Sequence, residues 1–119
     1  MLIHFKRLSL TLQKDDFRSI LKRGKFRVSL TSEELWILEM AAKLQEDVAD
    51  FSFQTSGSTG LPKKITLSKD QLIQSAETTL SHFSIKPSAR FLLCIHPQFI
   101  GGAMQIVRAY VSQGQLDVL

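Results

Sequence analysis

Cysteine is nearly absent from this chain. Cys94 is the single cysteine among 119 residues, so no disulfide can form within the chain, and nothing indicates an oxidising compartment. No uninterrupted apolar run approaches the roughly 20 residues that cross a bilayer. Charges at Lys6, Arg7 and Lys14 interrupt the first segment, which excludes an ordinary signal-peptide core. We therefore expect a soluble, cytoplasmic protein without a membrane partner.

A large excess of charge of one sign is also lacking. Fifteen lysines and arginines stand against eleven aspartates and glutamates, which gives a net charge of +4, densest from Lys14 to Arg27. This balance favours anionic partners such as nucleotides, coenzyme A, nucleic acid or acidic lipid, and it equally describes a solvated surface. The sequence has no aromatic RNP pattern or zinc-ligand spacing, so we expect no nucleic-acid partner.

Few residues have the spacing of metal ligands. Cys94 and His96 are two apart and would share one face of a strand, but no second pair accompanies them. We therefore expect a buried thiol beside a loop histidine, and no metal site. Trp36 and Met40, which are four apart, are expected to belong to the core.

What the chain does have is a core-forming pattern. Its 44% of apolar residues suit one core, and 119 residues are too few for two of normal size. Capping boxes at Thr31–Glu34 and Ser68–Gln71 mark two helix starts. We expect a strand over 8–12, a helix over 15–23 ended by Gly24, a loop or edge strand over 25–30, a helix over 31–45, strands over 51–54 and 64–67, a helix over 68–83 with Phe83 on its apolar face, a strand buried on both sides over 91–95, a helix over 102–112 and a strand over 116–119. Alternating strands and helices predict an α/β fold with right-handed crossovers.

The sequence stops within the strand expected over 116–119. Natural domains rarely end by leaving a strand pattern open. We therefore expect these residues to be the first part of a longer enzyme.

The most distinctive segment is the loop over 55–64, with the sequence TSGSTGLPKK. Its glycines let the backbone approach a ligand and turn successive N–H groups inward as an anion nest. The hydroxyls of Ser56, Ser58 and Thr59 add donors, and Lys63 adds positive charge. These groups suit a polyphosphate, although the same composition also occurs in ordinary hairpin turns. The loop is not a Walker loop, which needs Gly-Lys-Ser/Thr leading into a helix.

The residue order in FQTSGSTGLPKKI resembles the phosphate-loop signature of the acyl-adenylate-forming superfamily, which includes acyl-CoA synthetases, luciferases and adenylation domains of peptide synthetases. That pattern is Thr-Ser-Gly-Ser/Thr-Thr-Gly-x-Pro-Lys, usually followed by Gly, and Lys64 stands in this last place. The resemblance implies a partial N-terminal portion of the large domain of these enzymes, an α/β fold with a mixed or parallel sheet and helices on its faces. It also implies that the loop binds the β- and γ-phosphates of ATP together with Mg²⁺ while a carboxylate attacks the α-phosphorus. The implied phosphate-binding residues are Thr55, Ser56, Gly57, Ser58, Thr59, Gly60 and Lys63.

A second segment, IHPQFIGGAMQIVRA over 95–109, is similar to a stretch of o-succinylbenzoate–CoA ligases of menaquinone biosynthesis. In that family a proline opens a loop, two small residues start a helix and an arginine follows within two turns. The resemblance implies that Arg108 pairs with a carboxylate of the o-succinylbenzoyl group. The helical periodicity of this segment by itself predicts only an arginine on the helix surface. Many relatives have a histidine where Ile100 stands, and Phe99 would form the aromatic wall instead. The implied substrate-binding residues are Phe99, Gly101, Gly102 and Arg108.

The resemblance divides the chain into a trimmed lead-in over 1–49, the strand, phosphate loop and strand over 50–67, and α/β units over 68–119. It implies an ATP-dependent acid–CoA ligase that uses ATP, Mg²⁺, coenzyme A and a small carboxylic acid, with the remainder of its own chain as partner. The catalytic residues are unknown, because the superfamily's catalytic lysine belongs to a C-terminal domain absent from these residues, and the 119 residues alone are expected to be inactive. Two alternatives stay open, another aryl- or fatty-acyl-CoA ligase and a basic anion-binding module without catalysis.

Overall fold

The α/β class predicted from the sequence is confirmed. The computed structural model describes residues 1–119 except 9, 13–15, 48–49 and 56–59. Its elements in chain order are β1 (Leu2–Phe5), the 3₁₀ helix η1 (Lys6–Leu8), β2 (Leu10–Leu12), α1 (Phe17–Lys22), α2 (Gly24–Ser29), α3 (Ser32–Gln45), β3 (Asp50–Gln54), β4 (Lys64–Ser68), α4 (Lys69–His82), β5 (Arg90–Leu93), α5 (Ile100–Val111) and β6 (Gln115–Val118).

Four strands form a mixed sheet in the order β2-β1-β6-β5. β1, β6 and β5 run parallel, and β2 is antiparallel to β1. Because side chains alternate along a strand, every second residue faces the same side. The buried residues of the parallel strands stand in register in two rows, Ile3, Leu116 and Phe91 in one and Phe5, Val118 and Leu93 in the other. These two rows form one wall of the hydrophobic core.

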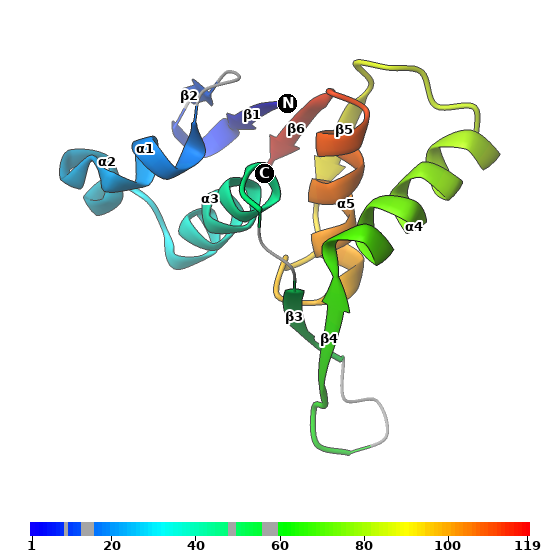
Figure 1. Ribbon diagram of the computed structural model, residues 1–119. Coiled ribbons are helices and arrows are strands. Elements are labelled where there is room, and N and C mark those ends of the chain that lie inside the picture. The colour runs from blue at the N-terminus through cyan, green and yellow to red at the C-terminus, as the bar shows by residue number, and fades with distance from the viewer. Residues whose placement is uncertain (9, 13–15, 48–49, 56–59) are drawn as a thin grey trace.

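Helices pack over this wall (Figure 1). α5 contacts β5 and β6, α3 and α4 pack against α5, and α1 packs against α3. Both helix starts predicted from capping boxes are confirmed. The side chains of Thr31 and Ser68 each accept a hydrogen bond from the backbone N–H three residues on, and their own backbone N–H groups donate to the side chain of that same residue. The β5–α5–β6 unit thus carries the parallel crossover expected from the sequence.

β3 and β4 form a separate antiparallel hairpin, with Asp50 paired to Ser68 and Gln54 paired to Lys64. The hairpin projects from the body of the molecule (Figure 1). An isolated parallel bridge between Gln54 and Phe99 joins it to the segment before α5. The sequence pattern suggested successive strands of one sheet, whereas the structure places β4 and β5 in different sheets.

The strand predicted over 91–95 is shorter and buried on one side only. β5 ends at Leu93, and its residues alternate between exposed and buried. Leu92 is 48% exposed and Ile95 is 52% exposed. The prediction of burial on both sides is wrong, because the described helices cover one face of this strand. Cys94, which we expected to be a buried thiol, is exposed.

The N-terminal region departs most from the sequence pattern. Residues 24–29 form the helix α2 rather than a loop or edge strand. Gly24 directly follows Arg23, the C-cap of α1, as predicted, but it also begins α2. The strand expected over 8–12 is reduced to β2, because Lys6–Leu8 forms a 3₁₀ turn. β1 was not predicted at all, although Ile3 and Phe5 alternate with His4 at strand period.

The end of α4 also differs from the expected apolar face. Leu72 and Ala76 are buried as predicted, but Phe83 is 68% exposed. Phe83 follows the last helical residue as its C-cap, and its ring makes an edge-on contact with His82, 4.9 Å between centroids. The change of backbone direction at the cap therefore removes Phe83 from the helix face that the spacing assigned to it.

Candidate functional site

The predicted phosphate loop lies at the tip of the β3–β4 hairpin. Thr55 and Lys63 close its neck: the Thr55 N–H donates to the Lys63 carbonyl at 2.8 Å, and the Lys63 N–H donates to the Thr55 hydroxyl oxygen at 2.9 Å. A hairpin forms here because two strands of alternating apolar residues, with Phe51 and Phe53 on one of them, flank a polar stretch rich in turn residues. The neck holds the two ends of the loop at a fixed separation.

Within the loop, the structure describes only part of the predicted set. Ser56, Gly57, Ser58 and Thr59 lie outside the described residues. Gly60 has a φ of +138°, a backbone conformation that side-chain-bearing residues rarely adopt.

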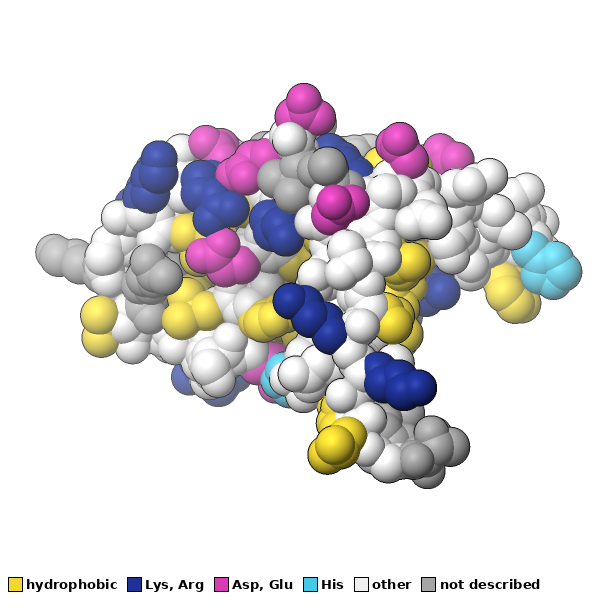
Figure 2. Space-filling model, turned by 60° about the horizontal axis from the view of Figure 1, so that its bottom comes forward, with side chains coloured by type: hydrophobic (Ala, Val, Ile, Leu, Met, Phe, Trp, Pro, Cys, Tyr) yellow, Lys and Arg dark blue, Asp and Glu magenta, His cyan; other side chains and the backbone are white. Residues whose placement is uncertain are grey.

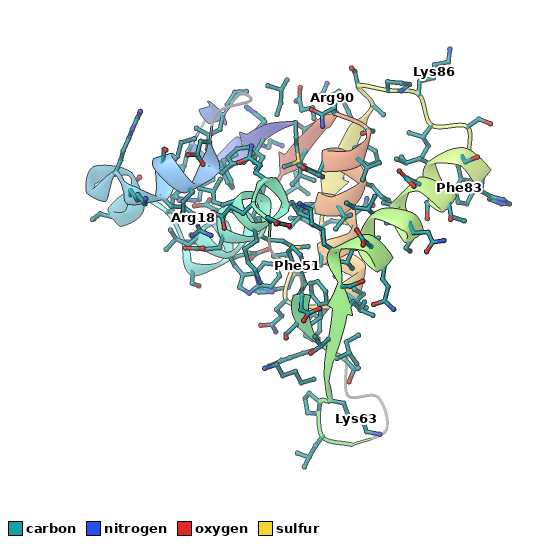
Figure 3. The ribbon with its side chains drawn as sticks, viewed as in Figure 1. Arg18, Phe51, Lys63, Phe83, Lys86 and Arg90 are labelled. Carbon is teal, nitrogen blue, oxygen red and sulfur yellow. The ribbon has the colours of Figure 1, made fainter. Side chains whose placement is uncertain are left out.

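The two lysines at the end of the loop are exposed. Figure 3 shows Lys63 at the projecting end of the hairpin. Its ammonium group can therefore approach an anionic ligand without first leaving a protein partner among the described residues.

A backbone contact links the loop to the second predicted segment. The Gln54 N–H donates to the Gln98 carbonyl at 3.2 Å, beside the bridge between Gln54 and Phe99. The Gln98 N–H in turn donates to Nδ1 of His96 at 3.2 Å. Phe99 is the N-cap residue of α5, so the end of β3 reaches the start of this helix. The structure therefore brings the phosphate-loop neck and Phe99 together.

The two glycines predicted to bind substrate have different surroundings. Gly101 is exposed, and a Cβ there would have no heavy atom within 4 Å apart from its own neighbours. Gly102 is buried, and a Cβ there would lie 2.5 Å from the carbonyl oxygen of Ile95 and 2.6 Å from that of His96. Gly102 thus allows α5 to begin directly against the segment that follows β5.

Arg108 lies farther along α5 and is partly buried. Its Nη1 donates to Oε1 of Gln105 at 2.8 Å, and Nε2 of Gln105 lies 3.4 Å from the Leu92 carbonyl oxygen. Nε of Arg108 is enclosed but has no hydrogen-bond partner among the described residues. A buried N–H without an acceptor is costly, so this donor is unsatisfied within the described part of the chain.

An open cavity of about 350 Å³ borders the neck of the loop. Pro62 and Lys64 from the loop side and Gln54 and Gln98 from its base line this cavity, together with Trp36 of α3. Arg108, Gly101 and Gly102 are not among its lining residues. The prediction that Trp36 is simply a core residue is incomplete, because Trp36 is only partly buried.

Gln54 and Gln98 also belong to this region and were not predicted from the sequence. Their positions in the sequence could have indicated this, since Gln54 directly precedes Thr55 and Gln98 directly precedes Phe99, two residues that the resemblance assigned to a site. None of the contacts described here tests the assigned roles, which stay predictions.

Known proteins share both the architecture and part of the sequence. No family model matches the chain. The crystal structure of an AMP-forming acyl-CoA synthetase/AMP-acid ligase II-like protein from Dyadobacter fermentans matches 82% of this chain at 32% sequence identity, with a TM-score of 0.64. The fold is that of an adenylate-forming enzyme. The chain spans 26% of the length of the Dyadobacter protein.

A second similarity lies in sequence alone. A protein described as a probable nonribosomal peptide synthetase, CymA, from Salinispora arenicola is 34% identical over 62 residues, which are 52% of this chain and 1% of that protein. Together the two comparisons support the adenylate-forming superfamily and a ligase-type enzyme family.

Two further structural findings concern membranes and metals. No described helix has both the length and the apolar character needed to cross a bilayer. Over the residues that the structure describes, no three histidine, cysteine, aspartate or glutamate side chains are grouped so that they could hold a metal ion.

Proposed function

We propose that this chain supplies the triphosphate-binding part of an ATP-dependent acid–CoA ligase, and specifically of an o-succinylbenzoate–CoA ligase in menaquinone biosynthesis. Such a ligase first joins the carboxylate to AMP with release of pyrophosphate, and then transfers the acyl group from AMP to the coenzyme A thiol. The observation that carries the proposal is the closed neck of the β3–β4 loop, where Thr55 and Lys63 bond reciprocally around a sequence of the superfamily signature.

The residues around this loop fit a polyphosphate. Lys63 is an exposed cation at the end of the loop, and Gly60 has the backbone freedom that a close ligand approach needs. A ligand phosphate carries several negative charges, so a positioned ammonium and inward backbone N–H groups would stabilise it. When bound, Mg²⁺ would share in neutralising these charges. The chain's own part in the reaction is to hold the leaving phosphates in place.

Arg108 supports the acid proposed as substrate. The spectator carboxylate of o-succinylbenzoate needs a partner when it leaves water. The enclosed and unpartnered Nε of Arg108, next to an Nη1 already held by Gln105, offers such a donor. A guanidinium can present two parallel N–H groups to one carboxylate, so Nε and the second terminal nitrogen suit this task.

A second candidate is an adenylating enzyme that passes the acyl group to an acceptor other than coenzyme A. The similarity to a peptide synthetase favours it. Both candidates share the adenylation half-reaction and differ in the thiol acceptor. An assay of acyl transfer with coenzyme A separates them.

The binding half of the proposal is testable on the 119-residue chain by titration with MgATP. Lys63→Ala should raise the dissociation constant by about ten- to 150-fold, because one charge-assisted contact contributes roughly 1.5–3 kcal/mol. Lys86→Ala is the matched control, since Lys86 is an exposed lysine far from the hairpin (Figure 3) and the charge change is the same. Equal losses in both variants would show that net charge, not the loop, governs binding.

The chemical half needs two further measurements. The 119-residue chain should release no pyrophosphate in response to an acid, because the adenine-binding and catalytic-lysine motifs that the resemblance requires are not in its sequence. In a complete ligase, Lys63→Ala should slow adenylation while sparing thioester formation from pre-made acyl-adenylate. Robust acyl-adenylate formation by residues 1–119 would contradict the prediction that these residues do not catalyse adenylation alone. Equal loss of both half-reactions in Lys63→Ala would contradict the assignment of Lys63 to adenylation.

A further inference from the structure

A trough runs between α3 and the hairpin. The 350 Å³ cavity at the neck of the loop adjoins a second cavity of about 220 Å³, and the two share Trp36, Ser52 and Phe53 in their walls. On the α3 side, Trp36, Met40 and Lys43 are spaced four and three residues apart and therefore lie along one face of the helix. We call this feature the α3–β3 trough.

The walls of the trough combine an aromatic surface with polar groups. Trp36 is partly buried, as expected of a ring with one surface against the core and another toward the trough. Gln54 and Gln98 lie at the end nearest the loop, where their side-chain amides can donate and accept hydrogen bonds. Ser52 lines both cavities between these groups, and its hydroxyl lies 3.3 Å from that of Thr66.

The trough is positively charged at both ends. Lys43 stands with Nζ 4.6 Å from the centre of the Phe51 ring and 3.5 Å from the Asp50 carbonyl, and Lys64 lines the opposite end. Among the described residues, neither lysine pairs with a carboxylate. The acidic residue in the wall, Glu39, is already paired with Arg18 at 2.6 Å.

The molecular surface agrees with this reading. Figure 2 looks onto the end of the molecule from which the hairpin projects. Lysine and arginine side chains follow the hairpin there, with hydrophobic side chains beside them, while the acidic side chains gather farther from the loop. An anion that approaches this end therefore meets cations next to an apolar surface.

We propose that the α3–β3 trough is a binding site for a planar aromatic ring that carries a negative charge, with the ring against Trp36 and the charge at Lys43 or Lys64. Aromatic rings stack favourably on indole, and a lysine at the end of such a site fixes the direction of the charged group. The amides of Gln54 and Gln98 would bind polar atoms at the ring edge. Neither Lys63 nor Arg108 lines the trough, so the site is separate from the proposed phosphate and acid contacts.

Two sources supply this chemistry, an aryl carboxylate and a nucleotide. Trp36 is the single tryptophan of the chain, so one indole N–H resonance reports on the trough directly. The probes are 2-naphthoate and AMP, titrated without Mg²⁺ into the ¹⁵N-labelled chain, with 2-naphthalenemethanol and adenosine as uncharged counterparts. We expect at least one charged probe to shift the indole resonance and the amide resonances of Ser52 and Gln54 saturably. Its uncharged counterpart should bind more weakly, and the probe that binds identifies the source.

Substitutions separate the trough from its surroundings. One of the two variants Lys43→Ala and Lys64→Ala, the one that removes the lysine at the charged group, should weaken binding by about two- to fivefold, the range for exposed charge pairs. Trp36→Leu should weaken it at least about fivefold, followed through the Ser52 and Gln54 amides, whereas Trp36→Phe should retain much of it. Lys86→Ala, which removes an exposed lysine far from the hairpin, should leave binding unchanged. If a Trp36 variant fails to fold, the two lysine variants carry the test alone, because both remove flexible side chains at the surface.

Two results would overturn the proposal. One is the lack of a saturable shift with both charged probes. The other is loss of binding in Lys63→Ala with no loss in Lys43→Ala or Lys64→Ala, which would place the probe in the phosphate loop. The proposal does not depend on the ATP site, whose own test is the effect of Lys63→Ala on MgATP affinity. The trough proposal and the ATP-site proposal can therefore fail independently.

Discussion

Thr55 and Lys63 hold the two ends of the β3–β4 loop together with a reciprocal pair of hydrogen bonds of 2.8 and 2.9 Å. One bond joins two backbone groups, so it survives most substitutions. The other requires the hydroxyl oxygen of Thr55 as acceptor. Residue 55 thus acts through its side chain on the shape of the loop, whereas the Lys63 side chain stays free for a ligand.

Replacing Thr55 by valine should loosen the neck, because valine keeps the shape of the side chain but removes the acceptor. We expect the Lys63 amide hydrogen to exchange with solvent about two- to twelvefold faster, as loss of a hydrogen bond of roughly 0.5–1.5 kcal/mol predicts. MgATP affinity should fall in parallel. Thr55→Ser keeps the hydroxyl and should behave like the parent chain. Identical exchange in both variants would show that the hydroxyl does not hold the neck.

Adjacent glycines at the start of α5 should respond oppositely to alanine. Gly102→Ala places a Cβ within 2.6 Å of two carbonyl oxygens, so α5 must move, and we expect a loss of about 1–3 kcal/mol in the free energy of unfolding. Gly101→Ala meets open space and should be neutral or up to about 1 kcal/mol stabilising, because alanine favours helix. Urea denaturation of the two variants tests this contrast, and equal effects would refute the packing role of Gly102.

Glu34 should make the fold sensitive to acid. Hydrogen bonds from Arg7 lower the pKa of this carboxyl, against the opposing effect of burial. A carboxyl with a lowered pKa in the folded state contributes stability above its ordinary pKa of about 4.5, and that contribution is lost as the pH falls through the folded value. The unfolding free energy should therefore decline below about pH 4.5.

Glu34→Gln should be less stable than the parent at pH 7 and should decline less steeply in acid. The introduced amide oxygen can still accept the Thr31 N–H bond of the capping box, so the loss reports mainly on the pair with Arg7. Glu33→Gln removes the same charge from the same helical turn and serves as the control. Denaturation curves between pH 3 and 7 measure both slopes, and indistinguishable slopes would exclude the Arg7–Glu34 pair as their cause.

Arg108 should select the acid. In a complete ligase, Arg108→Ala should lower kcat/KM for o-succinylbenzoate by roughly ten- to 100-fold, because the spectator carboxylate loses a charged donor. KM for ATP should barely move, since the triphosphate would lie at the loop that begins at Thr55. The monocarboxylate 3-benzoylpropionate lacks the spectator group, so its kcat/KM should fall little in Arg108→Ala. If kcat/KM falls equally for both acids, Arg108 is a structural residue that holds Gln105 against β5.

Local signals in the sequence were sufficient for most of the helices and for the hairpin. The capping boxes of α3 and α4 act over three residues, and the alternation of Phe51 and Phe53 acts over four, so neighbouring residues alone decide them. The loop 55–64 could likewise be identified as a candidate phosphate loop, because the order of its glycines, hydroxyls and lysines is visible in the sequence alone. The predictions of a strand buried on both sides over 91–95 and of a loop or edge strand over 25–30 were wrong, because each inferred tertiary neighbours from a local pattern that does not contain them.

The sequence by itself determined the α/β class, the loop with its glycines, hydroxyls and lysines, and the presence of Arg108 on a helix. The tertiary structure decided which strands meet: β1 pairs with β6, although these strands lie at opposite ends of the chain, because the rows containing Ile3 and Phe5 complete the buried wall of the sheet. It also decided that Gln54 reaches Gln98, that Gly102 lies against two carbonyls, and that α3 and β3 leave a trough at Trp36. Such contacts depend on the simultaneous packing of distant segments, and no pattern within a single segment encodes that packing.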